Sequence, residues 1–214
     1  MLAAFIFAIV AATVPTPNRS QRAVLIEVMR LALAGDHRDS RIEYSVRRVD
    51  ARQALASRVI VWAHASPRWT ATIGGPATIV DIGRVRYQCL PVDDHPRCAQ
   101  LATSGVAVTT SADVYFVAVA LARRYTIAEL ANRTIAGEDA RCFRLSVIGS
   151  GPVITGLGVR LDSCFTDDGL LLYTVVVRSG GSDTRVAVRM QRGLKADDIH
   201  ALRARYTDGS IPGL

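Results

Sequence analysis

Apolar and polar residues alternate along most of the chain with a period of two, which is typical of half-buried β-strands. In the first such segment, Ile42, Tyr44 and Val46 alternate with charged or polar residues. The alternation recurs in segments 68–73, 77–82, 85–89 and 184–190, and segments 59–62 and 170–177 are almost continuously apolar. Because short turns separate most of these segments, the pattern favours one meandering antiparallel sheet over alternating α/β units.

A helical pattern stands at residues 20–34, ahead of the first expected strand. Ser20 is a suitable N-cap and Gly35 is a stop signal. Only three residues of the segment are charged, so the helix is apolar around most of its circumference. Such a helix must be mostly buried, and we expect it to cover a concave apolar surface.

Two later segments are also expected to be helical. Segment 111–125 begins with Ser111 as a possible N-cap and ends with two arginines, which favours a helix. Its content of β-branched residues favours a strand instead, and we prefer the helix. Segment 195–206 is acidic at its start and basic later, which is typical of a short terminal helix.

The four cysteines fall into two close pairs. Segment 134–169 predicts a β-hairpin with Cys142 on one strand and Cys164 on the other. Pairing these two cysteines places Leu145 opposite Leu161, so one register aligns the apolar faces and brings both sulfurs together on the polar face. Sequence alone does not fix the connectivity. This pairing needs no further assumption, and we interpret it as a cross-strand disulfide that staples a curved, one-sided sheet.

The second pair, Cys89 and Cys98, flanks another expected hairpin, and a disulfide there follows from the same reasoning. Its register is less regular, since Leu101 then lies opposite Arg86. Both pairs fit hairpin geometry and neither forms a Cys-x-x-Cys motif, so two disulfides explain the cysteines better than zinc ligands do. Disulfides favour an oxidising compartment.

An uncharged apolar run of 13 residues, Leu2–Val14, lies near the start of the sequence. It is too short to span a bilayer and suits the core of a signal peptide. No basic residue precedes it and no clear cleavage site follows it, which a start codon assigned too far downstream would explain. We expect residues 1–18 to be a signal peptide or membrane-anchor segment and residues 19–214 to be a single domain. The predicted location is extracytoplasmic, secreted or anchored at the outer face of the cytoplasmic membrane.

Composition changes this picture little. The 214 residues are 50% hydrophobic and 21% charged, as in a folded domain with a sizeable core. The net charge of +7 comes from dispersed arginines, most of them on the polar faces of expected strands, so a solvated surface is the simplest explanation. A weak attraction to anionic lipid headgroups is the alternative. We expect no nucleic-acid partner, because the basic residues do not cluster with aromatic ones.

No catalytic or metal-binding constellation is recognisable in the sequence. The four histidines lie in separate elements without metal-ligand spacing: His37, His64, His95 and His200. The residues of segments 93–95 and 167–169 are better explained as turns than as metal ligands. The glycines of segments 149–151 and 156–158 lack the surroundings of a nucleophile elbow or a nucleotide loop. We therefore expect no enzyme activity, no metal and no cofactor.

The order of these features resembles the LolA type of exported bacterial protein, which includes lipoprotein carriers and lipid-binding lipoproteins of the LppX/LprG kind. The matching motifs are Tyr-x-Cys at residues 87–89, Ile-Ala-Gly-x-x-Ala-x-Cys-Phe at 135–143, Cys-Phe-x-x-x-Gly at 164–169 and a closing segment at 194–199. The resemblance implies an α+β fold: a strongly curved antiparallel sheet, an unclosed half-barrel, covered on its concave face by helices. No lipobox cysteine follows the apolar run, and the sheet arginine of the LolA proteins has no clear counterpart here.

The resemblance also implies a hydrophobic cavity between sheet and helices that holds acyl chains. We therefore expect a protein that binds or carries a lipid or another hydrophobic ligand, with a gain of about 0.8 kcal/mol for each buried CH₂ group. Ordinary core packing is the simpler explanation of any single lining position. The candidate ligand-binding residues are the apolar positions expected on the inner face: Ile42, Tyr44, Val61, Trp69, Ile73, Val85, Tyr87, Phe143, Leu145, Leu161, Val186 and Val188.

The alternative is an interaction or sensory module of the cell envelope, similar to the MucB/RseB-type proteins that use this fold to regulate a membrane partner. Such a module carries no transported ligand. The expected partners are accordingly a lipid or lipidated molecule, the membrane surface and an envelope protein. An enzyme is the third and least favoured hypothesis. A stoichiometric lipid in the purified protein favours the carrier, and a fully packed interior favours the module.

Overall fold

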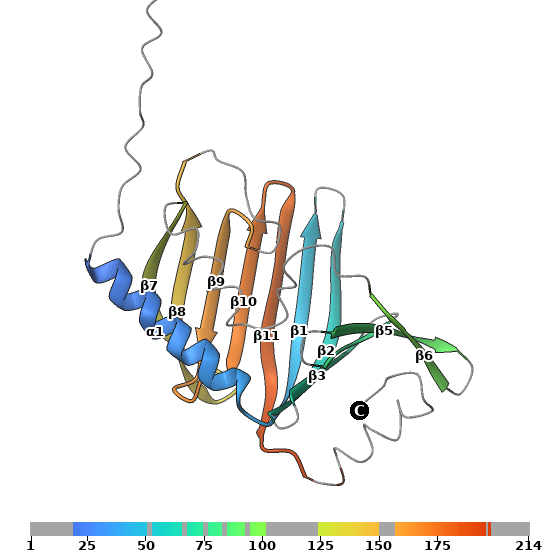
Figure 1. Cartoon of the computed structure of the whole chain (residues 1–214). Coiled ribbons are helices and arrows are strands. Elements are labelled where there is room, and N and C mark those ends of the chain that lie inside the picture. Colours follow the sequence, from blue (N-terminus) through green and yellow to red (C-terminus); the bar gives the residue numbers. More distant parts are fainter. Residues whose placement is uncertain are drawn as a thin grey trace, which may run out of the picture.

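The computed structural model describes residues 19–50, 53–65, 68–74, 77–82, 85–92, 95–101, 124–149, 157–195 and 197. One helix and eleven strands have defined bounds there: α1 (Arg19–Asp36), β1 (Ser40–Asp50), β2 (Ala54–Ala65), β3 (Arg68–Ile73), β4 (Thr78–Ile82), β5 (Val85–Val92), β6 (His95–Gln100), β7 (Tyr125–Ile135), β8 (Glu138–Val147), β9 (Arg160–Phe165), β10 (Leu171–Arg178) and β11 (Gly181–Arg192). All eleven strands belong to one unclosed sheet, in the order β6-β5-β4-β3-β2-β1-β11-β10-β9-β8-β7 (Figure 1).

Every neighbouring pair of strands in the sheet is antiparallel, as the alternating pattern predicts. The chain starts in the middle with β1 and moves outward to β6. It then starts again at the other end with β7 and moves inward to β11, which pairs with β1. The first and last strands are therefore neighbours, and the sheet consists of two meanders joined side by side.

Helix α1 confirms the helix expected at residues 20–34. It lies across the sheet at β7 to β11 (Figure 1). Val28, Leu31 and Ala32 form its buried side, at the three- and four-residue spacing of one helix face. They pack against side chains such as Phe143 and Leu161. We call this side of the sheet the α1 face.

Cross-strand pairs show how the α1 face continues beyond the helix, because directly paired residues point to the same side. Leu161 on β9 pairs with Val176 on β10, so both residues lie on the α1 face. The pairs between β10 and β11 and between β11 and β1 extend this face as far as β1. On the far side of β1 it continues from Ile42 to Val61 and from Val61 to Thr72. The α1 face is thus apolar under the helix and mixed in composition farther away.

In the half of the sheet formed by β3 to β5, the buried apolar residues lie on the opposite face. Trp69, Ala71, Val80 and Tyr87 form a buried cluster there, and Leu194, after β11, packs against it. The expectation of a one-sided sheet is therefore wrong. Each face is apolar where another part of the chain covers it, which is α1 on one side and the segment with Leu194 on the other.

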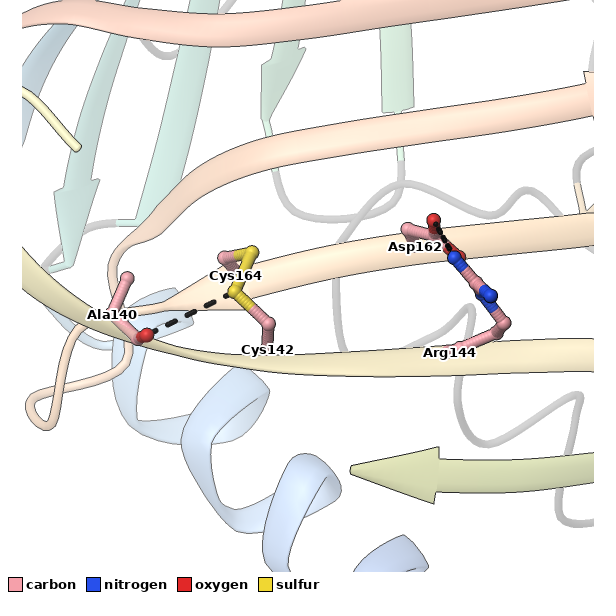
Figure 2. The surroundings of a disulfide bond; sticks show 5 residues. All are labelled: Ala140, Cys142, Arg144, Asp162 and Cys164. Atoms are coloured by element: carbon pink, nitrogen blue, oxygen red, sulfur yellow. Dashed lines mark hydrogen bonds and ion pairs between the residues drawn. A yellow bond between two sulfur atoms is a disulfide. The ribbon is translucent and has the colours of Figure 1, made fainter. Parts of the chain in front are cut away.

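The disulfide between Cys142 and Cys164 is present and joins directly opposite positions of β8 and β9 (Figure 2). Leu145 pairs with Leu161 in the same register, which confirms the predicted hairpin alignment. The two cysteines lie on the same side of the sheet as the ion pair between Arg144 and Asp162, as expected, but both are fully buried.

The tip of the β7–β8 hairpin buries this disulfide. A bulge between Leu130 and Arg133 interrupts the β7–β8 register, and bulges bend a strand. The Arg133 guanidinium lies over the ring of Tyr173 on β10, and β7 contacts β11. Ile135 and Ala140, on either side of the tip, belong to the same buried cluster as the disulfide.

The second predicted disulfide, between Cys89 and Cys98, is also present. The expected position of Leu101 opposite Arg86 is confirmed, since the Leu101 N–H donates to the Arg86 carbonyl at 2.9 Å. The register of β5 and β6 itself is regular. The other two expected helices lie outside the described residues, apart from 124, 125, 195 and 197, and Tyr125 already belongs to β7. Residues 1–18 lie outside as well. Cover by helices is therefore established for α1 alone.

Candidate ligand-binding cavity

A cavity of about 390 Å³ lies between the last turns of α1 and the α1 face of the sheet. Its walls include Ala32 of α1, Thr174 of β10 and Arg86 of β5. These three elements can border one cavity only if the sheet bends toward the helix. The α1 face is therefore the concave side, as the sequence analysis expects.

One wall of the cavity is apolar. It is formed by Ile42 of β1, Val61 and Ala63 of β2, Ile79 of β4 and Leu170. Strands β1 and β2 are neighbours, and β3 lies between β2 and β4. In each strand the lining residues alternate with others that point to the opposite face. The wall can bury an alkyl or aromatic group of a ligand.

Beside these apolar residues, on the same face of the sheet, the wall is polar and contains an ion pair. Arg86 on β5 donates two hydrogen bonds to the Asp81 carboxylate on β4, at 2.7 and 3.1 Å. Asp81 is almost fully buried, and its carboxylate raises the pKa of the Arg86 guanidinium. Thr70 and Thr72 add hydroxyl groups to this wall. Since Asp81 and Arg86 neutralise each other, the wall offers dipoles and hydroxyls rather than a net charge.

Arg185 on β11 supplies a cation without a carboxylate partner. It lines the cavity beside Thr174, its cross-strand partner on β10. Within the described part of the chain, no acidic side chain forms an ion pair with it. Tyr44, also in the wall, donates its hydroxyl hydrogen to the Leu171 carbonyl, and burial raises the pKa of its phenol. Arg185 is therefore the group that the cavity offers to an anion.

The end of α1 is fixed against the turn that connects β9 and β10. The Thr166 N–H donates to the Leu170 carbonyl at 3.0 Å, and the Gly169 N–H donates to the Thr166 carbonyl at 2.9 Å. Gly169 has a φ of +91° and lies in direct contact with the backbone of α1 at Gly35. Because Gly35, Gly169 and Leu170 all border the cavity, this contact sets the width of the cavity at that end.

The structure distributes the predicted lining residues over several places. Ile42, Tyr44 and Val61 line the cavity. Phe143, Leu145 and Leu161 lie on the same concave face, but α1 covers them and packs directly against them.

The remaining predicted residues do not share this face. Val186 packs against the cluster around the Cys142–Cys164 disulfide. Val188 is 46% exposed, because a bulge opposite Glu43 and Tyr44 leaves it unpaired. Four residues belong to the apolar cluster on the opposite face: Trp69, Ile73, Val85 and Tyr87. The expectation that all twelve share the inner face is therefore wrong, and their ligand contacts stay a prediction.

Sequence reasoning missed the polar half of the cavity. From the alternation in β3 we expect Trp69 on the inner face of the sheet. In the structure, Thr70 and Thr72 are the residues of β3 that line the cavity. The sequence feature that could have revealed Thr70 and Thr72 is that polar residues face one another across three neighbouring strands. Thr70 pairs with Asp81, and Asp81 pairs with Arg86, so three polar residues share one row of the sheet.

A second hollow, of about 430 Å³, lies at the β7–β8 tip. Arg192 donates to both Glu138 and Asp168 there, at 2.9 Å in each case. These ion pairs tie the hairpin tip to β11. Among the described residues there is no group of three acidic, histidine or cysteine side chains suited to a metal ion. No helix in the described ranges is long and apolar enough to cross a membrane.

A bent antiparallel sheet with an N-terminal helix on its concave side defines a LolA-like fold. Comparison with known structures agrees. The crystal structure of MucB matches with a TM-score of 0.54 and 15% identity, over 85% of this chain and 62% of MucB. MucB from Pseudomonas aeruginosa in complex with MucA matches at 0.50 and 15% identity, over 82% of this chain and 59% of that one.

Two further structures are similar. An uncharacterised conserved protein from Thermus thermophilus has a TM-score of 0.51 at 10% identity, over 90% of this chain and 97% of that one. A LolA superfamily protein from Nitrosomonas europaea has 0.39 at 15% identity, over 84% and 96%. The chain spans about three fifths of the MucB chains that it matches. No family model and no curated protein matches the sequence. The likeness to the structures with a TM-score of 0.50 or more shows the fold alone.

Proposed function

We propose that this protein is an exported envelope protein that binds a lipid-like amphiphile in the cavity between α1 and the concave face. The observation that carries the proposal is the composition of the cavity. An apolar wall around Ile42 and Val61 shares one space with the guanidinium of Arg185, which forms no ion pair with any of the described residues. A ligand with an alkyl part and an anionic group satisfies both features at once.

Two contributions to the free energy of binding favour such a ligand. Each CH₂ group buried against the apolar wall contributes about 0.8 kcal/mol. A carboxylate or phosphate at Arg185 forms a charge-assisted hydrogen bond, which is stronger than one between neutral groups. A volume of about 390 Å³ is near the lower end for small-molecule sites, so the cavity suits one chain better than a lipid with several.

The compartment argument points the same way. Two disulfides among four cysteines are typical of proteins in an oxidising compartment. The apolar run Leu2–Val14 suits an export signal or an anchor. We therefore place the protein outside the cytoplasm, secreted or held at the outer face of the cytoplasmic membrane, with residues 1–18 as the targeting segment and 19–214 as one domain.

A second candidate function is an envelope interaction module without a carried ligand. The observation that favours it is the likeness to MucB, one structure of which contains MucA as a partner. In that function the concave face contributes to a protein interface. The partner is then an envelope protein rather than a lipid.

Two tryptophan variants on the same strand test the cavity. Ala63→Trp places an indole in the cavity, and Ala56→Trp places one on the exposed opposite side of β2. Both are exported, purified and titrated with a fluorescent fatty acid. Because the indole occupies the space of the alkyl chain, Ala63→Trp is expected to weaken binding at least tenfold, whereas Ala56→Trp binds as the wild type does.

Extraction of the wild-type protein with organic solvent, followed by mass spectrometry, identifies what the cavity carries. A stoichiometric amphiphile in the wild type, absent from Ala63→Trp, supports the proposal. Equal fatty-acid affinity in the wild type and both variants contradicts it. An empty wild-type cavity without fatty-acid affinity leaves the interaction module as the function of this fold.

A further inference from the structure

Helix α1 has a second surface, which faces away from the sheet. Ile26 is 68% exposed and Leu33 is 38% exposed, and both are among the five exposed large apolar side chains of the described residues. They are seven positions apart, or about two helical turns, and therefore lie on the same side. Arg22 and Arg30, both exposed, flank them. We call these four residues the outer stripe; they fall within an arc of about 80° on the helix circumference.

The outer stripe is basic as well as apolar. Arg30 is 58% exposed and forms an ion pair with Glu27 at 2.9 Å. The Glu27 carboxylate also forms an ion pair with Arg141 of β8, on the sheet. The other carboxylate of the helix, Asp36, lies at the cavity. Two guanidinium groups therefore border Ile26 and Leu33. Among the described residues, the carboxylates that act on Arg30 are Glu27, which is shared with β8, and Asp167 in the turn after β9.

The position of α1 in the chain indicates what this surface contacts. Four residues separate the end of the apolar run Leu2–Val14 from Arg19, where the helix begins. A run of this length partitions into a lipid interface but does not span it. Whenever the run is in a membrane, the start of α1 lies at the lipid headgroups. One apolar segment gives weak attachment, and a neighbouring basic surface is the second signal that makes it stable.

We propose that the outer stripe of α1 docks on an anionic lipid surface. Ile26 and Leu33 enter the headgroup region, and Arg22 and Arg30 contact lipid phosphates. The helix then lies parallel to the membrane, with its opposite side still packed on the sheet. The docking does not depend on what fills the cavity, since none of the four side chains borders it.

Vesicle flotation with the full chain tests the docking. The vesicles contain phosphatidylcholine alone, or phosphatidylcholine with phosphatidylglycerol at a ratio of about 7:3, so that a basic surface is attracted only to the second kind. One basic residue near an anionic surface is worth about fivefold in binding, so Arg22→Gln with Arg30→Gln is expected to lower affinity for the anionic vesicles about 30-fold. Ile26→Glu with Leu33→Glu is expected to lower it at least as much. Leu55→Glu, at a leucine 51% exposed on β2, is the control and leaves binding unchanged.

Insertion has a direct readout. In Ile26→Trp, the added indole is expected to shift its emission to shorter wavelength on anionic vesicles, relative to the wild-type spectrum. The proposal is overturned if both double variants float as the wild type does, because the apolar run then holds the protein alone. It is also overturned if the wild type binds neither vesicle, or if the added indole stays in water while the protein is bound. Fatty-acid binding by the same variants reports on the cavity separately.

Discussion

Gly35, in the last turn of α1, and Gly169, in the turn between β9 and β10, meet backbone to backbone. A Cβ atom on Gly169 would collide with the Leu31 carbonyl and the Gly35 nitrogen, and one on Gly35 would collide with the Gly169 carbonyl. Because both glycines border the cavity, this contact couples the seating of the helix to the shape of the site.

The first prediction concerns Gly169→Ala. Gly169 has a φ of +91°, so alanine there is strained and also collides with α1. Gly137→Ala is the matched control, because Gly137 has a φ of +82° and open space around it. The control is expected to lose about 1 kcal/mol of unfolding free energy, for the backbone alone. Gly169→Ala is expected to lose about 3 kcal/mol, since overpacking adds to that strain. Equal losses in urea denaturation would show that the helix end is not in tight contact.

The second prediction concerns the two disulfides. Replacing Cys142 and Cys164 together by serine removes a bridge with a sequence separation of 22, against 9 for Cys89 and Cys98. The longer loop restricts the unfolded chain more, so the first double variant is expected to lose about 3 kcal/mol, and the second somewhat less. Thermal unfolding of both variants measures the difference. Four reactive thiols in the denatured, unreduced wild type would contradict both bridges.

The third prediction is a dependence of stability on acid pH through Glu27. Hydrogen bonds from Arg30 and Arg141 lower the pKa of the Glu27 carboxyl from 4.5 to about 2. A pKa that is lower in the folded state stabilises the protein above about pH 4.5, and that contribution is lost as the pH falls toward 2. Since the pair is partly exposed, we expect a contribution of about 1 kcal/mol.

Glu27→Gln isolates this effect. The variant is expected to be less stable than the wild type at pH 7. The difference shrinks as the pH falls and disappears only below about pH 2, since half of the wild-type carboxyl is still ionised at its folded-state pKa. Urea denaturation of both proteins at several pH values gives the two curves. Parallel curves over the whole range would show that the ion pair between α1 and β8 does not contribute.

The meander, α1 and both disulfides could be predicted from the sequence, because each depends on local spacing. Period-two alternation defines a strand, and Cys142 with Cys164 fixes a register that the paired leucines support independently. The LolA-like fold follows from the order of these elements. The predicted helix at 20–34 differs from α1 by one residue at its start and two at its end.

The identity of the concave face could not be predicted in the same way. Alternation shows that Trp69 and Thr70 point to opposite sides, but it does not show which side faces α1. The apolar side of the sheet changes between its two halves, because α1 covers one half and the segment with Leu194 packs on the other. Val188 was misplaced for a different reason, since one bulge shifts the alternation by a residue and no local residue pattern marks it.

The last prediction separates the two arginines of the cavity. Arg86 neutralises Asp81, which is 9% exposed, so Arg86→Gln leaves a buried carboxylate without its cation. Breaking a buried pair is strongly destabilising, and because the Arg86 side chain is 35% exposed we expect a loss of about 2 kcal/mol. Arg185→Gln breaks no ion pair within the part of the chain that the structure describes, and it is expected to change stability by less than about 0.5 kcal/mol. The same change is expected to weaken binding of an anionic amphiphile about tenfold, because a hydrogen bond to a charged group is lost.

A double-mutant cycle with Asp81→Asn and Arg86→Gln measures how much the ion pair between these two residues contributes to stability, with an expected coupling of about 1–2 kcal/mol. If Arg185→Gln lost stability and kept its affinity for the ligand, the two arginines would have exchanged the roles assigned to them.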